Sequence, residues 1–211
     1  MRKRDLLTAL AIVTAVGLAA VLCGAIGFAS TAGPVGGPRY SSERYGFSVP
    51  VPGGWHRSRA RLVPHLLDPR EIVSLGNFGM RVGGGGNCGR EPSAAIERMR
   101  RGDALVTIQE VGVFAKLRSH LRRNFPARPR RFEEDLRPAA FLGDSKTAGP
   151  MRYAKLAFSD RGRAFEALLY VDGPPTPALR SAIAAILDGL RFQAGSWERF
   201  HGDEGGVAAA S

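Results

Sequence analysis

The chain has 211 residues, of which 44% are hydrophobic, and it carries a formal net charge of +11. This length allows one globular domain with a full hydrophobic core, so neither disulfides nor a structural metal are needed for its stability. Nearly all basic residues are arginine. That bias fits either the codon usage of a GC-rich genome or recognition of carboxylate and phosphate groups, which arginine binds with paired hydrogen bonds. The charge suits a location near anionic surfaces but does not name the surface.

The N-terminus has the pattern of a membrane anchor. Residues 1–5 form a basic stub, and residues 6–29 form an uncharged apolar run. The run is long enough for a helix that crosses a bilayer, whereas a cleavable signal peptide has a shorter core of about 7–15 residues. Basic flanks stay on the cytoplasmic side. We therefore expect a single-pass protein of the cell membrane, with its N-terminus in the cytoplasm and its C-terminal domain outside.

Two alternatives for this leader stay open. Small residues at Ser30-Thr31-Ala32 would allow cleavage after Ala32, which would give a secreted protein. Lipoprotein processing would use Cys23, but Leu22 is bulkier than the residue that a lipobox has before its cysteine. The other cysteine, Cys88, would then be the single thiol of the exported part. Such a thiol is either a small buried side chain or, less often, redox-active or paired with another molecule.

The remaining chain reads as one domain between two irregular segments. Residues 30–40 are rich in Gly and Pro and predict a linker, residues 41–193 predict an extracytoplasmic domain, and residues 194–211 predict a flexible tail. The domain opens with alternating apolar residues from Tyr45 that predict a strand ending near Pro50. A Gly-Gly turn then returns Trp55 to the core.

The middle and the C-terminal third continue this mixture of strands and helices. Residues 92–101 predict a short helix that stops at Gly102, and the β-branched run at 104–111 predicts a strand. Residues 151–159 and 163–172 predict two antiparallel strands joined by a tight turn. Thr176 as N-cap and Pro177 in the first turn then predict a helix start. Its apolar stripe is formed by Leu179, Ile183, Ile186, Leu187 and Leu190. This order favours an α+β fold, in which helices pack against an antiparallel sheet.

Two segments resemble the PsbP-like sandwich superfamily. They are the opening YGFSVPVPGGW and the closing AFEALLYVDGPPTPALRSAIAAILDGLRF. In that superfamily a strand enters a Pro-Gly-Trp turn, and the domain ends with a strand pair, a helix and a short strand that finishes in Phe, here Phe192. The resemblance implies a PsbP-like α+β sandwich in an exported bacterial protein of unknown role, with a function in binding or assembly. It supplies no ligand-binding residue, and the anchor and the Arg-rich segment depart from the photosynthetic members.

The sequence predicts no catalytic residue, no metal site and no cofactor. The four histidines lack the i, i+4 spacing of a helical zinc site, and there is no Cys-x-x-Cys. The glycine-rich run at 83–89 lacks the Gly-Lys-Ser/Thr of a phosphate loop, and no Gly-x-Ser-x-Gly elbow is present. We therefore expect a binding or assembly protein. The alternative is an exported hydrolase or a thiol-dependent enzyme whose site residues are dispersed along the chain.

The most distinctive segment is KLRSHLRRNFPARPRR at 116–131, which has no acidic residue. Its apolar residues can share one helical face, so it can form a basic amphipathic helix that contacts anionic lipid or a cell-wall polymer. The other interpretation is a helix packed on the core with a solvated basic face. An envelope protein is a further candidate partner, and the absence of interleaved aromatic residues argues against nucleic acid. The candidate contact residues are Arg118, Arg122, Arg123, Arg128, Arg130 and Arg131.

Overall fold

The computed structural model describes residues 37–82, 91–112, 124–131, 136–138 and 151–202. All of them belong to the second of two compact units, which cover residues 1–34 and 35–211. No helix within these described ranges is long and apolar enough to cross a membrane. The predicted anchor at 6–29 lies outside the described residues, as does Cys88.

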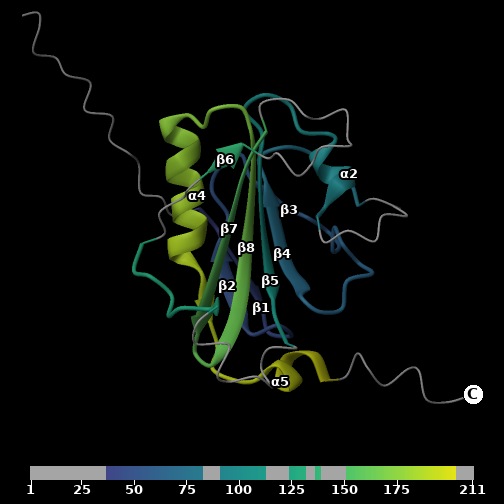
Figure 1. Cartoon of the computed structure of the whole chain (residues 1–211), viewed down its shortest axis with the longest axis vertical. Helices are drawn as coiled ribbons and strands as arrows, with labels where there is room; N and C mark the ends of the chain where they lie inside the picture. Colours follow the sequence, from purple (N-terminus) through teal and green to yellow (C-terminus); the bar gives the residue numbers. More distant parts are fainter. Residues whose placement is uncertain (1–36, 83–90, 113–123, 132–135, 139–150, 203–211) are drawn as a thin grey trace, which may run out of the picture. The chain divides into compact units, whose positions relative to one another are not determined.

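Two antiparallel sheets and three helices make up the described fold (Figure 1). The larger sheet has the strand order β3 (His56–Arg57), β4 (Arg70–Gly76), β5 (Ala104–Glu110), β8 (Arg163–Asp172), β7 (Met151–Asp160) and β6 (Arg137–Pro138). The smaller sheet consists of β1 (Arg39–Ser42), β2 (Phe47–Pro50) and β9 (Arg191–Phe192). The helices are α2 (Ser93–Ile96), α4 (Pro177–Gly189) and α5 (Trp197–His201). This combination confirms the predicted α+β class with antiparallel sheets.

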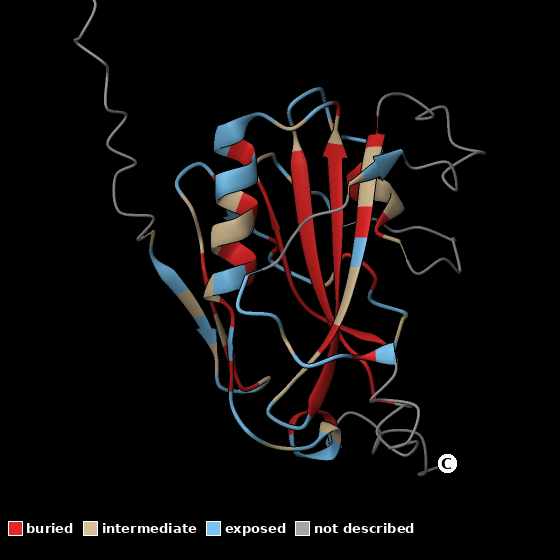
Figure 2. Ribbon diagram, turned by 60° about the vertical axis from the view of Figure 1, so that its left-hand side comes forward, coloured by how far each residue is buried: buried red, intermediate tan, exposed pale blue. Residues whose placement is uncertain are grey.

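Strand β8 is the centre of the molecule because both of its faces are covered. Its residues from Arg163 to Val171 are all buried, which Figure 2 shows as a continuous red strand. Phe165 and Leu169 on one face pack with the predicted stripe of α4 and with the small sheet. Leu168 and Tyr170 on the other face pack with the loop around Leu62 and with α2. The apolar run of β8 therefore holds two cores together.

The β7–β8 hairpin and the start of α4 form where the sequence predicts them. Arg161 and Gly162 join the strands with φ values of 50° and 82°, and this pair of positive values is typical of a tight hairpin turn. Thr176 caps α4, since its Oγ1 accepts a hydrogen bond from the Leu179 amide at 3.2 Å. Both elements are therefore stabilised by residues that are local in the sequence, the turn residues of the hairpin and the N-cap of the helix.

Two predicted elements differ in the structure. The predicted helix at 92–101 is confined to Ser93–Ile96, because the following residues form a turn in which the Asp103 carboxylate accepts the Arg100 amide at 2.7 Å. The segment predicted as a flexible tail, residues 194–211, contains a helix near its start. Residues 197–201 form α5, and Phe200 and His201 are buried. Residues 203–211 lie outside the described part of the chain.

Candidate anion-binding groove

Strands β5 and β8 carry a buried ion pair at their shared end. Arg163 donates from Nε to Glu110 Oε1 at 2.7 Å and from Nη2 to Glu110 Oε2 at 2.6 Å. The same guanidinium donates to the carbonyls of Tyr45 and Gly46 and lies 4.0 Å from the centre of the Phe200 ring. The side chains are 0% and 1% exposed, so the pair is shielded from water. Such paired geometry is needed to offset the loss of hydration.

His201 connects helix α5 to this ion pair. Its Nε2 lies 2.7 Å from Glu110 Oε2, and because a carboxylate only accepts, Nε2 carries the hydrogen. The ring also packs on Trp197 at a centroid distance of 4.0 Å. The other ring nitrogen, Nδ1, is buried and has no hydrogen-bond partner within the described residues. The Glu110 carboxylate is thus bound by Arg163 of β8 and by His201 of α5.

The other two buried glutamates, Glu71 and Glu166, also have hydrogen-bond or ion-pair partners. Glu71 accepts the amides of Leu62 and Val63 at 2.7 and 3.0 Å and the Ser74 hydroxyl at 2.6 Å. Burial raises the pKa of the Glu71 carboxyl, although these hydrogen bonds oppose the shift. Glu166 pairs with Lys155 at 2.7 Å. Glycoside hydrolysis by carboxylates needs a separated pair across a cleft, and these three carboxylates are instead engaged by partners within the domain.

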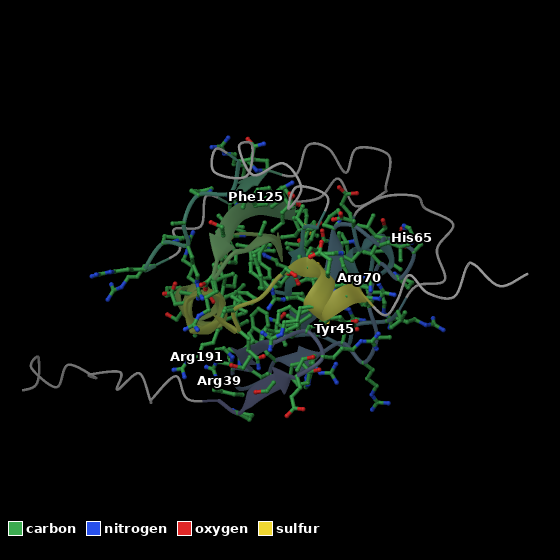
Figure 3. The ribbon with its side chains drawn as sticks, turned by 90° about the horizontal axis from the view of Figure 1, so that it is seen from below. Arg39, Tyr45, His65, Arg70, Phe125 and Arg191 are labelled. Carbon is green, nitrogen blue, oxygen red and sulfur yellow. The ribbon has the colours of Figure 1, made fainter. Side chains whose placement is uncertain are left out.

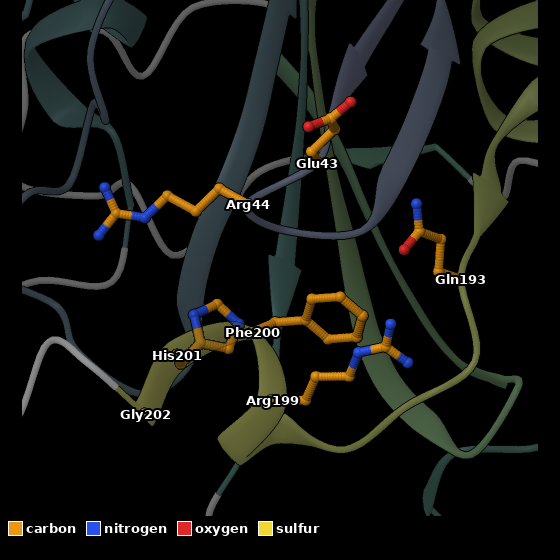
Figure 4. Close-up of a pocket in the computed structure, with 7 residues that line it drawn as sticks. All are labelled: Glu43, Arg44, Gln193, Arg199, Phe200, His201 and Gly202. Atoms are coloured by element: carbon orange, nitrogen blue, oxygen red, sulfur yellow. The ribbon is translucent and has the colours of Figure 1, made fainter.

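A pocket of about 370 Å³ lies between α5 and the turn that precedes β2 (Figure 4). Its wall contains Arg44, Arg199 and the edge of His201, but also the carboxylate of Glu43. Arg199 already donates to the Ala194 carbonyl at 2.9 Å. The mixed charges and the occupied arginine make this pocket a weak candidate for an anion.

A larger groove of about 760 Å³ lies beside β3, an edge strand of the larger sheet. We call it the basic groove. Its cationic wall consists of Arg57, Arg59 and Arg81, with the imidazole of His56 beside them, and among the described residues that line it there is no acidic side chain. Its apolar lining residues are Trp55, Met80 and Val82. Several cations around one concavity raise the local concentration of anions. The basic groove is therefore the candidate functional site.

Arg57 is fixed in place on the wall of the basic groove. Its Nη1 donates to the Ser58 carbonyl at 2.9 Å, and its guanidinium lies 4.3 Å from the centre of the Tyr40 ring. By contrast, the exposed side chains of Arg59, Arg81 and His56 make no hydrogen bond or ion pair with other described residues. These three side chains can therefore bind a ligand without giving up a partner.

The structure describes only residues 124–131 of the basic segment at 116–131. Arg118, Arg122 and Arg123 lie outside the described residues, whereas Arg130 and Arg131 are exposed. Phe125 is buried with Val111 and Ala164, as expected for a segment packed on the core.

Arg128, which was predicted to contact an anionic surface, instead binds the end of α4. It donates to the carbonyls of Leu187, Asp188 and Leu190 at 2.6, 3.0 and 2.6 Å, and it pairs with Asp160 at 3.1 Å. These contacts form because the last carbonyls of a helix lack partners within the helix and attract a cation.

A second pair of arginines lies on the small sheet. Arg39 of β1 is near Arg191 of β9 (Figure 3), and burial followed by the Arg191 charge lowers the pKa of Arg39. Arg39 donates to Ser48 Oγ at 2.9 Å and to the Gly189 carbonyl at 2.8 Å. Because the C-terminus of α4 already attracts Arg39, this pair is a weaker anion site than the basic groove.

Comparison with protein-family models finds no family that matches the chain, and comparison with curated proteins finds no significant relative. Sequence reasoning missed the groove because its two sides are far apart in the chain. They meet because β3 pairs with β4, with His56 opposite Gly76, so that the residues after β4 return to β3. The one usable signal was the group of basic residues at 56–59, which has no acidic neighbour.

Proposed function

We propose that this chain is a membrane-anchored binding protein that acts outside the cytoplasm, and that its basic groove recognises an anionic group of an envelope component. The observation that carries the proposal is the groove wall, where the charges of Arg57, Arg59 and Arg81 are not balanced by any acid among the described lining residues. Arginine binds phosphate and carboxylate through paired, charge-assisted hydrogen bonds. A concave wall of such donors favours an anionic ligand.

The buried carboxylates support binding over hydrolysis. Glu71, Glu110 and Glu166 are each held by hydrogen bonds or an ion pair inside the fold. The PsbP-like resemblance of the strand before Trp55 and of the closing helix also favours a binding or assembly role. The uncharged run at 6–29 supports anchoring, with its basic residues left in the cytoplasm.

Binding of a soluble polyanion tests the groove. The full chain in nonionic detergent is titrated with polyphosphate and compared with the double variant Arg59→Gln/Arg81→Gln. We expect affinity to fall by about a hundredfold, because each of the two lost arginine contacts to a charged group is worth about 1.5 kcal/mol. The matched control is Arg98→Gln/Arg161→Gln, which removes the same charge at exposed sites that line neither pocket. Equal losses in both double variants would show that only net charge matters.

The orientation of the anchor has a separate test. A reporter that is active only outside the cytoplasm is fused after Ser211, and the mass of the mature protein is measured. Activity with an intact N-terminus agrees with the anchor, whereas activity with loss of residues 1–32 would show the secreted alternative. An inactive reporter would contradict an extracytoplasmic domain.

A further inference from the structure

We propose that the occupant of the basic groove is the headgroup of an anionic phospholipid together with the first part of its acyl chains. This inference rests on the proposed function of the groove and adds the class of ligand. It depends on three features: the mixed lining of the groove, the fixed position of Arg57, and the place where the domain is joined to the linker.

The lining of the basic groove is suited to an amphiphile. Trp55, Met80 and Val82 contribute apolar surface beside the cations, and Val82 is 40% exposed. Within the described part of the chain, Val82 and Leu67 are the exposed large hydrophobic residues. A fully hydrophilic polyanion would satisfy the arginines but leave Val82 in water. A phospholipid would pair its phosphate with the arginines and cover Val82 with its chain, which is the more favourable outcome because apolar surface leaves water.

The cationic wall is partly organised before a ligand arrives. Arg57 is held by Tyr40 and by the Ser58 carbonyl. The Ser58 hydroxyl in turn donates to the Ala60 carbonyl and stabilises the turn that presents Arg59. A side chain that is already ordered loses less conformational freedom on binding. Arg57 therefore provides a fixed point for the phosphate, and the exposed Arg59 and Arg81 can close on it.

The groove lies beside the strand that follows the linker. Arg57 contacts Tyr40, the second residue of β1, and residues 30–38 connect β1 to the end of the predicted span. Nine extended residues reach at most about 30 Å. This short tether would keep the groove near the bilayer and raise the effective concentration of lipid headgroups around it. Charge then selects the anionic ones.

Photocrosslinking in a membrane tests the proposal on the full chain. The protein is reconstituted into phosphatidylcholine vesicles that contain a small fraction of phosphatidylglycerol with a photoreactive group on its acyl chain, and labelled peptides are mapped by mass spectrometry. We expect labelling in residues 55–59 and 79–82. The Arg59→Gln/Arg81→Gln variant should lose most of this labelling, whereas Arg98→Gln/Arg161→Gln should keep it. Photoreactive phosphatidylcholine at the same fraction should label the groove weakly.

Three results would overturn the inference: equal labelling by the two lipids, labelling outside these segments, or labelling that the groove variant retains. The polyphosphate titration separates the two proposals. If polyphosphate binding needs Arg59 and Arg81 but phosphatidylglycerol does not label the groove, the groove is an anion site for a different ligand and only the lipid inference fails. If both experiments fail, the proposed function fails as well. Circular dichroism of each variant verifies that it is folded.

Discussion

Arg163 of β8 and Glu110 of the neighbouring strand β5 form two parallel hydrogen bonds inside the core. Because His201 binds the same carboxylate from α5, three distant parts of the chain meet at one acidic side chain. The arrangement satisfies the charges locally and connects the C-terminal helix to the sheet. It explains how these ionisable side chains are accommodated inside the core.

Replacing Glu110 with Gln should strongly destabilise the protein. The substitution removes the charge that balances Arg163, whose side chain is 0% exposed, and breaking a buried ion pair in this way costs about 3–5 kcal/mol. Urea unfolding at neutral pH measures the change. The matched control is Glu166→Gln, whose partner Lys155 is 40% exposed, so the loss there should stay below about 1 kcal/mol. Similar losses for the two variants would contradict the account of the buried pair.

Replacing Gly112 with Ala should displace α5. A Cβ at this position would overlap the indole ring of Trp197, so the helix must move away from the sheet. Hydrogen exchange of the amides at 197–201 should then accelerate, and overpacking should cost about 1–3 kcal/mol of stability. Gly53→Ala is the control, because its Cβ would meet nothing within 4 Å. Unchanged exchange in Gly112→Ala would show that α5 is not docked as described.

Replacing Arg128 with Ala should weaken the end of α4. The side chain binds three carbonyls there and is only 15% exposed, so we expect a loss of about 1–3 kcal/mol. Hydrogen exchange should increase at the last turn of the helix. Arg130→Ala, at an exposed position in the same segment, should change stability by less than about 0.5 kcal/mol. If Arg130→Ala were the more damaging change, the capping role of Arg128 would be wrong.

The pH dependence of stability should contain a contribution from Glu71. Burial raises the pKa of this carboxyl above its ordinary value of 4.5, so the folded protein keeps the proton over a pH range in which the unfolded chain has lost it. The contribution is fully present below pH 4.5 and is lost as pH rises through the raised pKa. Glu71→Gln should remove this decline, because an amide can still accept from Leu62 and Val63 and donate to Ser74.

Unfolding free energies measured from pH 4 upward would check the Glu71 prediction. The exposed Glu97 provides the control, since Glu97→Gln should keep the slope of the unsubstituted protein. A slope that is the same in Glu71→Gln would mean that another group causes the decline.

Local chemistry explains which elements were predictable from the sequence. The β7–β8 hairpin and α4 depend on neighbours, such as Gly162 in the turn and Thr176 at the cap. Helix α5 has only five residues, too few to show a helical period. It is ordered by contacts with Glu110 and Gly112, which are far away in the chain.

The candidate site was unpredictable for a related reason. Arg59 and Arg81 become neighbours only through the pairing of β3 with β4, and no local pattern encodes that pairing. Sequence reasoning instead favoured the basic run at 116–131. In that run Arg128 is occupied by α4, and Arg130 and Arg131 remain exposed.

The most direct test of the groove is to observe which backbone amides respond to an anion. Isotope-labelled full chain is titrated with inorganic phosphate, and amide chemical shifts are followed by NMR. The account predicts saturable shifts concentrated at 55–59 and 79–82, and loss of these shifts in Arg59→Gln/Arg81→Gln. Shifts centred on Arg39 and Arg191, or weak shifts spread over all exposed arginines, would contradict it.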